Sequence, residues 1–134
     1  MRVASLPIIK TFSLDSDPEK LAEVDIRQAT YGDNRQHDEL FKTTRTLYNA
    51  KGTVIGTEQD LNWREIAAKR ICLTLAGARN ITNEEGKELF TFNNQRPTSE
   101  AEFRRCLDTL PDDFVGEIHS KVIEVNPQWR TVGN

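Results

Sequence analysis

The chain contains 134 residues with a formal net charge of −3; 37% of the residues are hydrophobic and 29% are charged. A chain of this length normally forms one domain and buries enough apolar surface to fold without a disulfide or a metal ion. The composition excludes a fully disordered chain, and the lack of a strongly basic stretch argues against a surface that follows nucleic-acid phosphates. We therefore expect a single domain over residues 1–134, with no nucleic-acid partner.

Cysteine usage and hydropathy indicate where the protein acts. Cys72 and Cys106 do not form a Cys-x-x-Cys pair, and both lie in apolar runs, where a free cysteine behaves as a small hydrophobic residue. One long-range disulfide is an alternative. The first apolar run is too short for a secretion signal because Pro7 and Lys10 interrupt it, and no segment has the roughly 18 apolar residues of a membrane span. We expect a soluble, reduced, cytoplasmic protein without a membrane partner.

Residues 1–21 are predicted to form an extended arm. Between residues 3 and 14 the apolar side chains recur mainly with the two-residue period of a strand, although Lys10 interrupts the row. Pro7 cannot donate to a central ladder, so this segment suits a sheet edge. Residues 15–20 then have the composition of a turn. The recurring apolar residues are Leu6, Ile8, Phe12 and Leu14.

The next elements are a strand and a capped helix. Residues 22–29 alternate between apolar and polar side chains, which is typical of a half-buried strand. Thr30 precedes Asp33 by three residues, the spacing of a helix capping box. A helix is therefore predicted over residues 31–50, followed by a stop at Gly52. Its apolar face would contain Leu40, Phe41, Thr44, Leu47 and Tyr48.

The middle of the chain is ambiguous between helix and strand. Residues 53–56 fit a short strand or a loop. Residues 61–76 are assigned to a helix because their apolar side chains recur at helical spacing. Residues 71–75 are also typical of a strand, which would pair with residues 88–92. Residues 81–92 have the composition of a loop or a hairpin.

Residues 97–129 predict two helices joined by a short turn. The pattern Ser-x-x-Glu at residues 99–102 is a capping box, and Pro111 ends the first helix. Asp112 or Asp113 would cap the second helix, where negative charge is favoured. The apolar face of the first helix contains Phe103, Cys106, Leu107 and Leu110, and that of the second contains Phe114, Val115, Ile118, Val122 and Val125.

Together these elements predict an α+β fold. Small N-terminal strands precede a mainly helical remainder, which ends in a two-helix hairpin. The single domain would comprise the extended arm at 1–21, a body of strands and helices at 22–96, and the C-terminal helical pair at 97–129. No internal repeat or low-complexity segment divides it.

No pattern in the sequence indicates catalytic residues, a cofactor or a metal. His37 could share a metal ion with Asp33 or Asp38, but polar residues on one helix are more often solvated. A cysteine and histidine pair would need an exposed, activated thiol, whereas both cysteines fall on predicted core faces. His119 lies off the apolar face of its helix, so we expect it at the surface.

Four carboxylates cluster around the turn between the two C-terminal helices. They could bind Mg²⁺ through oxygen ligands. Helix capping and the favourable field at a helix N-terminus explain them more simply. The four residues are Asp108, Asp112, Asp113 and Glu117.

Aromatic residues are the better candidates for function, as anchors of a protein interface. Trp129 follows Pro127 after the last predicted helix, and an aromatic side chain with one wet edge commonly anchors an interface. Alternatively, Trp129 folds back onto the helical pair. We predict a partner-binding or self-association surface formed by Trp63, Phe114, Ile118, Val122 and Trp129.

The order of these elements resembles the small tail assembly chaperones encoded by tailed bacteriophages. The similar segments are the strand and capped helix at Val24–Asp33, the turn at Asn83–Phe90, the pair Leu110-Pro111 and the ending Val125-Asn-Pro-Gln-Trp129. The resemblance implies a non-catalytic protein of the host cell cytoplasm. Such a protein binds the tape-measure and tail-tube proteins during tail assembly and is absent from the finished particle.

Two other functions fit the sequence. The first is a structural virion subunit, such as a connector, tail-terminator or baseplate component, in which residues 1–14 would lock neighbouring subunits by strand addition. The second is a small metal-dependent nuclease that uses the acidic cluster. Loss of nuclease activity in an Asp112→Ala, Asp113→Ala variant would be needed to support it.

Overall fold

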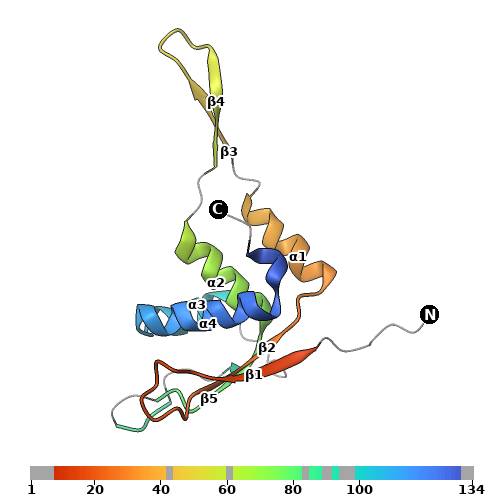
Figure 1. Cartoon of the computed structure of the whole chain (residues 1–134). Coiled ribbons are helices and arrows are strands. Elements are labelled where there is room, and N and C mark those ends of the chain that lie inside the picture. Colours follow the sequence, from red (N-terminus) through yellow and green to blue (C-terminus); the bar gives the residue numbers. More distant parts are fainter. Residues whose placement is uncertain are drawn as a thin grey trace, which may run out of the picture.

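Helices pack on one face of an antiparallel sheet, and a separate β-hairpin projects away from this body (Figure 1). The α+β fold expected from the sequence is confirmed, including the C-terminal helical pair. The computed structural model describes residues 8–41, 44–59, 62–82, 85–88, 92–93 and 99–130.

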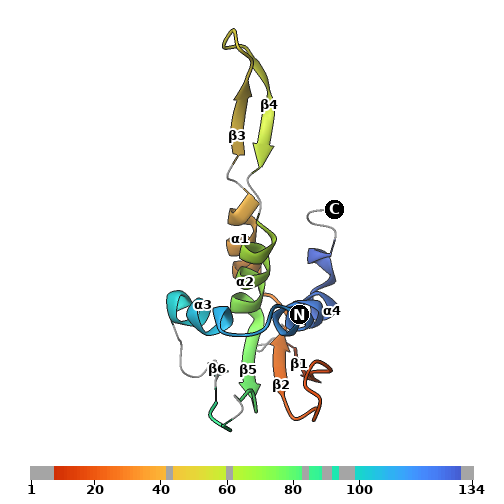
Figure 2. The ribbon, with the colours of Figure 1, turned by 90° about the vertical axis from the view of Figure 1, so that its left-hand side faces the viewer.

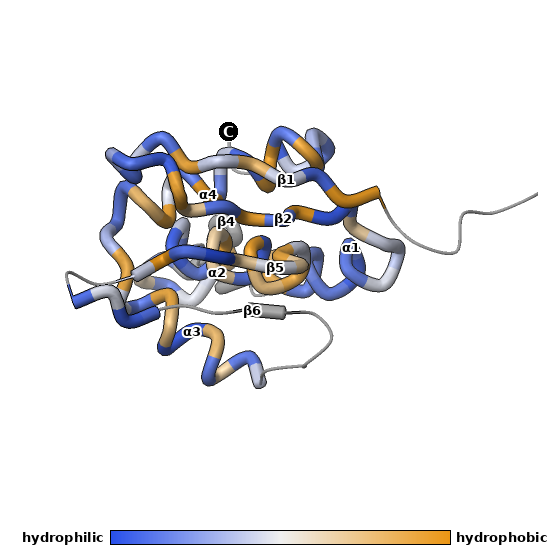
Figure 3. Tube along the Cα trace, turned by 90° about the horizontal axis from the view of Figure 1, so that it is seen from below, coloured by the Kyte–Doolittle hydropathy of each residue, from blue (hydrophilic) through white to orange (hydrophobic). Residues whose placement is uncertain are grey.

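The main sheet has four antiparallel strands, which lie side by side when the molecule is seen from below (Figure 3). In β2, Val24 and Ile26 are buried under the helices, whereas Asp25 faces away from them and pairs with Arg79 of β5 at 2.6 Å. The half-buried strand predicted within residues 22–29 is confirmed. In spatial order the strands are β1 (Ile9–Ser13), β2 (Glu23–Arg27), β5 (Leu75–Arg79) and β6 (Phe92–Asn93).

Four α-helices complete the body. Helix α4 packs on β2, and α2 lies between α3 and α4 (Figure 2). Helix α1 packs against α2. Apolar side chains from both ends of the described chain meet in one core, which includes Leu14, Val24, Ile26, Ile71, Phe103, Ile118, Val122 and Trp129. The helices are α1 (Tyr31–Asp38), α2 (Trp63–Thr74), α3 (Glu100–Asp108) and α4 (Asp112–Val125).

The predicted capping box at the start of α1 is confirmed. The Thr30 hydroxyl accepts a hydrogen bond from the Asp33 amide at 3.2 Å, and the Asp33 carboxylate accepts one from the Thr30 amide at 2.9 Å. The same carboxylate binds the Arg27 guanidinium at 2.5 Å. Two elements therefore fix this helix end, since β2 supplies the arginine. The α-helix stops at Asp38 and a 3₁₀ turn follows over Glu39–Phe41.

The prediction that this helix continues to residue 50 is wrong, because residues 44–59 form an antiparallel hairpin. The segment Thr-Arg-Thr-Leu-Tyr is rich in β-branched and aromatic residues, which favour strands. In the turn, the Asn49 side chain accepts hydrogen bonds from two backbone amides at 2.9 Å each, and Gly52 takes a φ of +81°. The strands are β3 (Thr44–Tyr48) and β4 (Val54–Gln59).

The segment that the sequence left open between helix and strand contains both. Helix α2 ends at Thr74, and the chain continues directly as strand β5. Strand β5 pairs with β2 on one side and with residues 92–93 on the other. Of the partner segment predicted at residues 88–92, only residue 92 therefore pairs with β5. Gly77 lets β5 approach β2 closely, because an added Cβ would lie 2.6 Å from a carboxylate oxygen of Asp25.

Local signals define the two C-terminal helices. The Ser99 hydroxyl accepts a hydrogen bond from the Glu102 amide at 3.2 Å, which is one of the two hydrogen bonds of the predicted capping box. The expected acidic cap of α4 is not formed, because Pro111 occupies the capping position and makes no side-chain hydrogen bond there. Asp112 and Asp113 lie in the first turn instead, where their charges favour the helix N-terminus.

Candidate partner-binding groove

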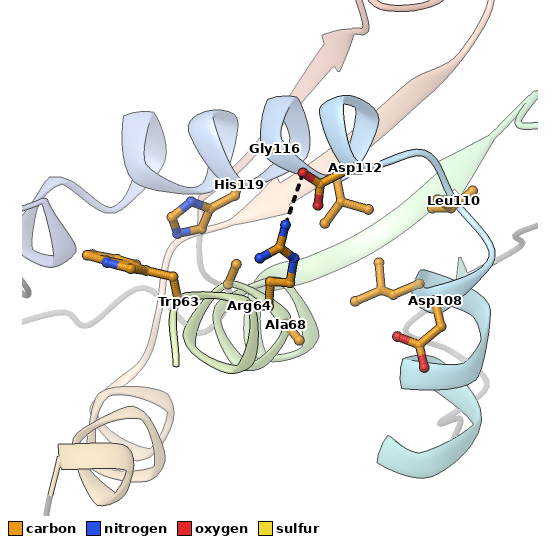
Figure 4. A pocket seen from close by; sticks show the side chains of 11 residues that line it. Trp63, Arg64, Ala68, Asp108, Leu110, Asp112, Gly116 and His119 are labelled. Carbon is orange, nitrogen blue, oxygen red and sulfur yellow. Dashed lines mark hydrogen bonds and ion pairs between the residues drawn. The ribbon is translucent and has the colours of Figure 1, made fainter. Parts of the chain in front are cut away.

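A groove with a volume of about 440 Å³ runs between helices α2, α3 and α4 (Figure 4). Space remains there because Ala67, Ala68 and Gly116 have little or no side chain. A Cβ added to Gly116 would meet no atom within 4 Å. We call this surface the α2–α4 groove; it is lined by Trp63, Arg64, Ala67, Ala68, Leu107, Asp108, Leu110, Asp112, Val115, Gly116 and His119.

The rim of the α2–α4 groove combines an exposed aromatic side chain with charges. Trp63, the first residue of α2, has 53% of its surface exposed. Arg64 reaches Asp112 across the groove at 3.4 Å (Figure 4), but both side chains are largely in water, so this ion pair adds little stability. Asp108 lies at the α3 end. A ligand can therefore meet apolar surface between groups of both signs.

The structure separates the five residues predicted to form a partner surface. Trp63 is exposed beside the groove, and Phe114 is half-buried at a different depression, near the turn at residues 16–22. Ile118, Val122 and Trp129 are buried in the core, so as placed they cannot contact a partner. The reason is that strand β2 packs on the apolar face of α4 and that helix α1 covers Trp129, contacts that helical periodicity alone does not reveal.

Trp129 adopts the folded-back alternative. It lies in a 3₁₀ turn at Pro127–Trp129, and only 2% of its surface is exposed. Its indole N–H donates to the side-chain oxygen of Asn34 at 2.9 Å, and its ring stacks on His37 with centroids 4.6 Å apart. The residue thus closes the fold by joining the end of α4 to α1.

A buried arginine lies beneath this contact. Arg70 of α2 is 1% exposed, and each arm of its guanidinium has a different partner. Nε donates to Nε2 of His37 at 3.0 Å, Nη1 lies 3.2 Å from Nε2 of His119, and Nη2 donates to the carbonyl of Trp129 at 3.0 Å. We call these four residues the Arg70 cluster. No carboxylate among the described residues forms an ion pair with Arg70.

This geometry holds both histidines in the neutral form. Because Arg70 only donates, the nearer nitrogen of each imidazole must accept and therefore carries no proton. Burial lowers the pKa of His37, and the charge of Arg70 lowers it further, against the opposing effect of Asp38. Burial and the same arginine lower the pKa of His119 to about 4. The expectation of a solvated His37 is thus wrong, because this residue is buried, whereas His119 is half-buried and still lines the α2–α4 groove.

Sequence reasoning missed Arg70 as a member of any site. An arginine inside a helix is normally a solvated residue, and its three partners come from segments far apart in the sequence. One weak signal was present, because Arg70 follows Ile66 by four residues and so shares a helical face with a core residue. Nothing in the sequence indicated which acceptors would surround it.

The side chains considered for metal binding or nucleophilic chemistry lie in different places in the described structure. Within the described parts of the chain, no group of three or more histidine, cysteine or acidic side chains could hold a metal ion. Glu117 instead accepts hydrogen bonds from the Asp15 and Ser16 amides at 2.9 and 3.1 Å. Both cysteines are free thiols, and burial followed by the nearby charge of Glu100 raises the pKa of Cys72, which disfavours its thiolate.

Asn126 is expected to be a strong stability determinant. It is fully buried; its Oδ1 accepts from the Ala29 amide at 2.8 Å, and its Nδ2 donates to the Arg27 carbonyl at 3.3 Å. Asn126→Ala leaves both backbone groups unpaired in the interior. We expect a loss of about 1–3 kcal/mol in the free energy of unfolding, measured with urea.

Gln128→Ala is the matched control, because this neighbouring amide is exposed. Its loss should change the free energy of unfolding by no more than about 0.5 kcal/mol. An equal effect of the two substitutions would contradict the role assigned to Asn126.

Comparison with known proteins supplies no relative, since no family model, no curated protein and no solved structure matches the chain. Across the described ranges, no helix has both the length and the apolar character required to cross a membrane.

Proposed function

We propose that this protein is a non-catalytic tail assembly chaperone of a tailed bacteriophage, which binds the tape-measure or tail-tube protein in the host cytoplasm during tail assembly. The observation that carries the proposal is the α2–α4 groove, an open apolar surface with an exposed Trp63 at its rim. A chaperone of this kind needs a site that holds apolar segments of an unassembled partner, and it needs no catalytic group.

The shape and chemistry of the groove suit an amphipathic helix of the partner. Three helices form its walls, and small side chains at its floor admit the larger apolar side chains of a docked helix. Trp63 offers a large apolar area with little loss of side-chain entropy, as interface anchors commonly do. Asp108 and Asp112 outnumber Arg64 at the rim, which favours a partner helix with basic residues beside its apolar stripe.

A binding assay with the purified tape-measure and tail-tube proteins of the same phage tests the proposal. We expect the wild-type chain to capture at least one of them, and Trp63→Ala to weaken that binding about 30-fold, as for an interface residue worth about 2 kcal/mol. Tyr31→Ala is the control, because Tyr31 is also an exposed aromatic residue at the start of a helix, but it lies outside the groove. Failure of the wild-type chain to bind either protein would exclude the chaperone function.

A structural virion subunit is the second candidate, and the projecting β3–β4 hairpin favours it. Hairpins and edge strands lock neighbouring subunits in many assemblies by strand addition. Mass spectrometry of purified particles separates the two functions, since a chaperone should be missing from them. A stoichiometric copy number in the particle would support the structural role. The genomic position gives an independent test, because a tail chaperone gene should lie just before a very long tape-measure gene.

A further inference from the structure

The β3–β4 hairpin is an incomplete sheet. In the described part of the chain, β3 and β4 pair only with each other, and their extensive contacts are with each other alone. Both views of the ribbon show the hairpin extending away from the helices (Figures 1 and 2). An isolated two-stranded hairpin is at best marginally stable in water, whereas three or more strands with a hydrophobic face can be stable on their own. Among the described residues, no third strand adjoins the hairpin.

Its two outer edges are not equivalent. The register between the strands shifts between Leu47 and Tyr48, which leaves Ile55 as an extra residue in β4. Such a bulge disrupts the outer edge of its own strand and hinders further pairing. Strand β3 has no extra residue. Residues 44–59 also contain no proline, which is one of the devices that protect exposed edges. A further strand can therefore pair more readily with the outer edge of β3 than with that of β4.

We infer that β3 pairs with β3 of a second copy of this chain, in antiparallel orientation, to form a four-stranded sheet in the order β4–β3–β3–β4. The sequence of β3 suits a two-fold axis at Thr46. That axis places the two Thr46 residues opposite each other and each Arg45 opposite Leu47 of the second copy. Threonine pairs are favourable across strands, and in this register no like charges face each other directly. The β3 edges of two copies are therefore compatible with each other around a two-fold axis.

This dimer lies apart from the α2–α4 groove and does not depend on the proposed function. None of the residues that line the groove belongs to the hairpin. Two copies joined through their hairpins would carry two separate grooves, one on each body. Substitutions in β3 should therefore change the oligomeric state without changing the stability of the body or binding at the groove.

Sedimentation equilibrium of the full chain, with charge variants of β3, tests the inference. The wild-type chain should sediment as a dimer. Thr46→Lys places two ammonium groups opposite each other at the axis and should raise the dimer dissociation constant at least about tenfold. Thr46→Glu should do the same. An equimolar mixture of the two variants should recover a dimer, because opposite charges then face each other.

Thr57→Lys is the matched control, since Thr57 pairs with Thr46 within the hairpin but lies on the outer strand of the proposed sheet. It should leave the dimer intact, and circular dichroism should show a folded body in every variant. A monomeric wild-type chain would overturn the inference. So would a Thr46→Lys variant that dimerises as the wild type does, or a mixture of the two Thr46 variants that stays monomeric.

Discussion

Arg70→Ala is expected to lower the free energy of unfolding by about 3–5 kcal/mol, measured by urea denaturation. The substitution leaves a cavity at a position that is 1% exposed. It also leaves the Trp129 carbonyl and the acceptor nitrogen of His37 without their donor, and each buried unpaired group costs about 1–3 kcal/mol. Domains are typically stable by about 5–15 kcal/mol, so this variant should be marginally folded.

Two further substitutions separate the causes of that loss. Arg70→Lys keeps the charge but has no planar fork that reaches three diverging acceptors, so it should remain strongly destabilised. Arg70→Met fills the cavity without burying a charge, and we expect it to be less harmful than Arg70→Ala. Arg64→Ala, one helical turn and a half earlier on an exposed face, should change stability by no more than about 0.5 kcal/mol. A similarly small effect of Arg70→Ala would refute the structural role of the cluster.

Acidification from pH 7 towards pH 4 should destabilise the protein through its two histidines, the only ones in the sequence. In the folded chain the pKa of His37 lies below 6.5, and that of His119 is about 4. In the unfolded chain both have an ordinary pKa near 6.5. As the pH falls below 6.5, the two imidazoles therefore become protonated in the unfolded chain while they stay neutral in the folded chain.

The resulting stability change has a definite sign and window. The contribution of each histidine is complete above pH 6.5 and declines as the pH falls towards the folded pKa, by up to about 1.4 kcal/mol per pH unit. Asp25 and Asp33 act with the same sign but at lower pH. Hydrogen bonds from Arg79 lower the pKa of Asp25, and those from Arg27 and Thr30 outweigh the effect of burial on Asp33. The effects of these two aspartates therefore begin near their ordinary pKa of 3.8, and those of Glu100 and Glu117 begin near 4.5, below most of the histidine window.

Urea denaturation at half-unit pH steps, repeated on a His37→Gln, His119→Gln variant, checks this result. Glutamine keeps an oxygen that can accept from Arg70 but does not titrate, so the variant should lose the slope between pH 6.5 and 4.5. In a Trp63→Phe background, Trp129 is the only tryptophan and its fluorescence reports on the cluster itself. A wild-type free energy of unfolding that stays constant from pH 7 to 5 would contradict the neutral, buried state of the histidines.

The elements that the sequence predicted well are those set by neighbouring residues. The capping pairs Thr30–Asp33 and Ser99–Glu102 mark helix starts, because the hydrogen bonds they make close within four residues. The alternation around Val24 identified β2 for the same reason, since a two-residue period needs no distant partner to be recognised. These signals sufficed for the α+β fold and for the C-terminal helical pair, but not for the hairpin at residues 44–59.

The predictions failed where a distant partner decides the structure. Leu47 and Tyr48 fit a helical face equally well by spacing, and only pairing with β4 makes them part of a strand. Ile118 and Trp129 were predicted to form a partner surface because the elements that cover them, strand β2 for Ile118 and helix α1 for Trp129, lie far earlier in the sequence. The Arg70 cluster combines four separate segments, so no local pattern contains it. Trp63, at the start of α2, is exposed beside the α2–α4 groove, and its partner-binding role stays a prediction.

The contact between Trp129 and Asn34 has a consequence for synthesis of the chain. This hydrogen bond and the one between Ala29 and Asn126 join residues more than ninety positions apart. While the ribosome is still making α4, Arg70 has already left the ribosome, but Trp129, whose carbonyl accepts from Arg70, has not yet been added. The body should therefore close only once residues up to 129 have left the ribosome. Nascent chains halted before that point should remain sensitive to protease, because the turn at Pro127–Trp129 supplies contacts that close the fold.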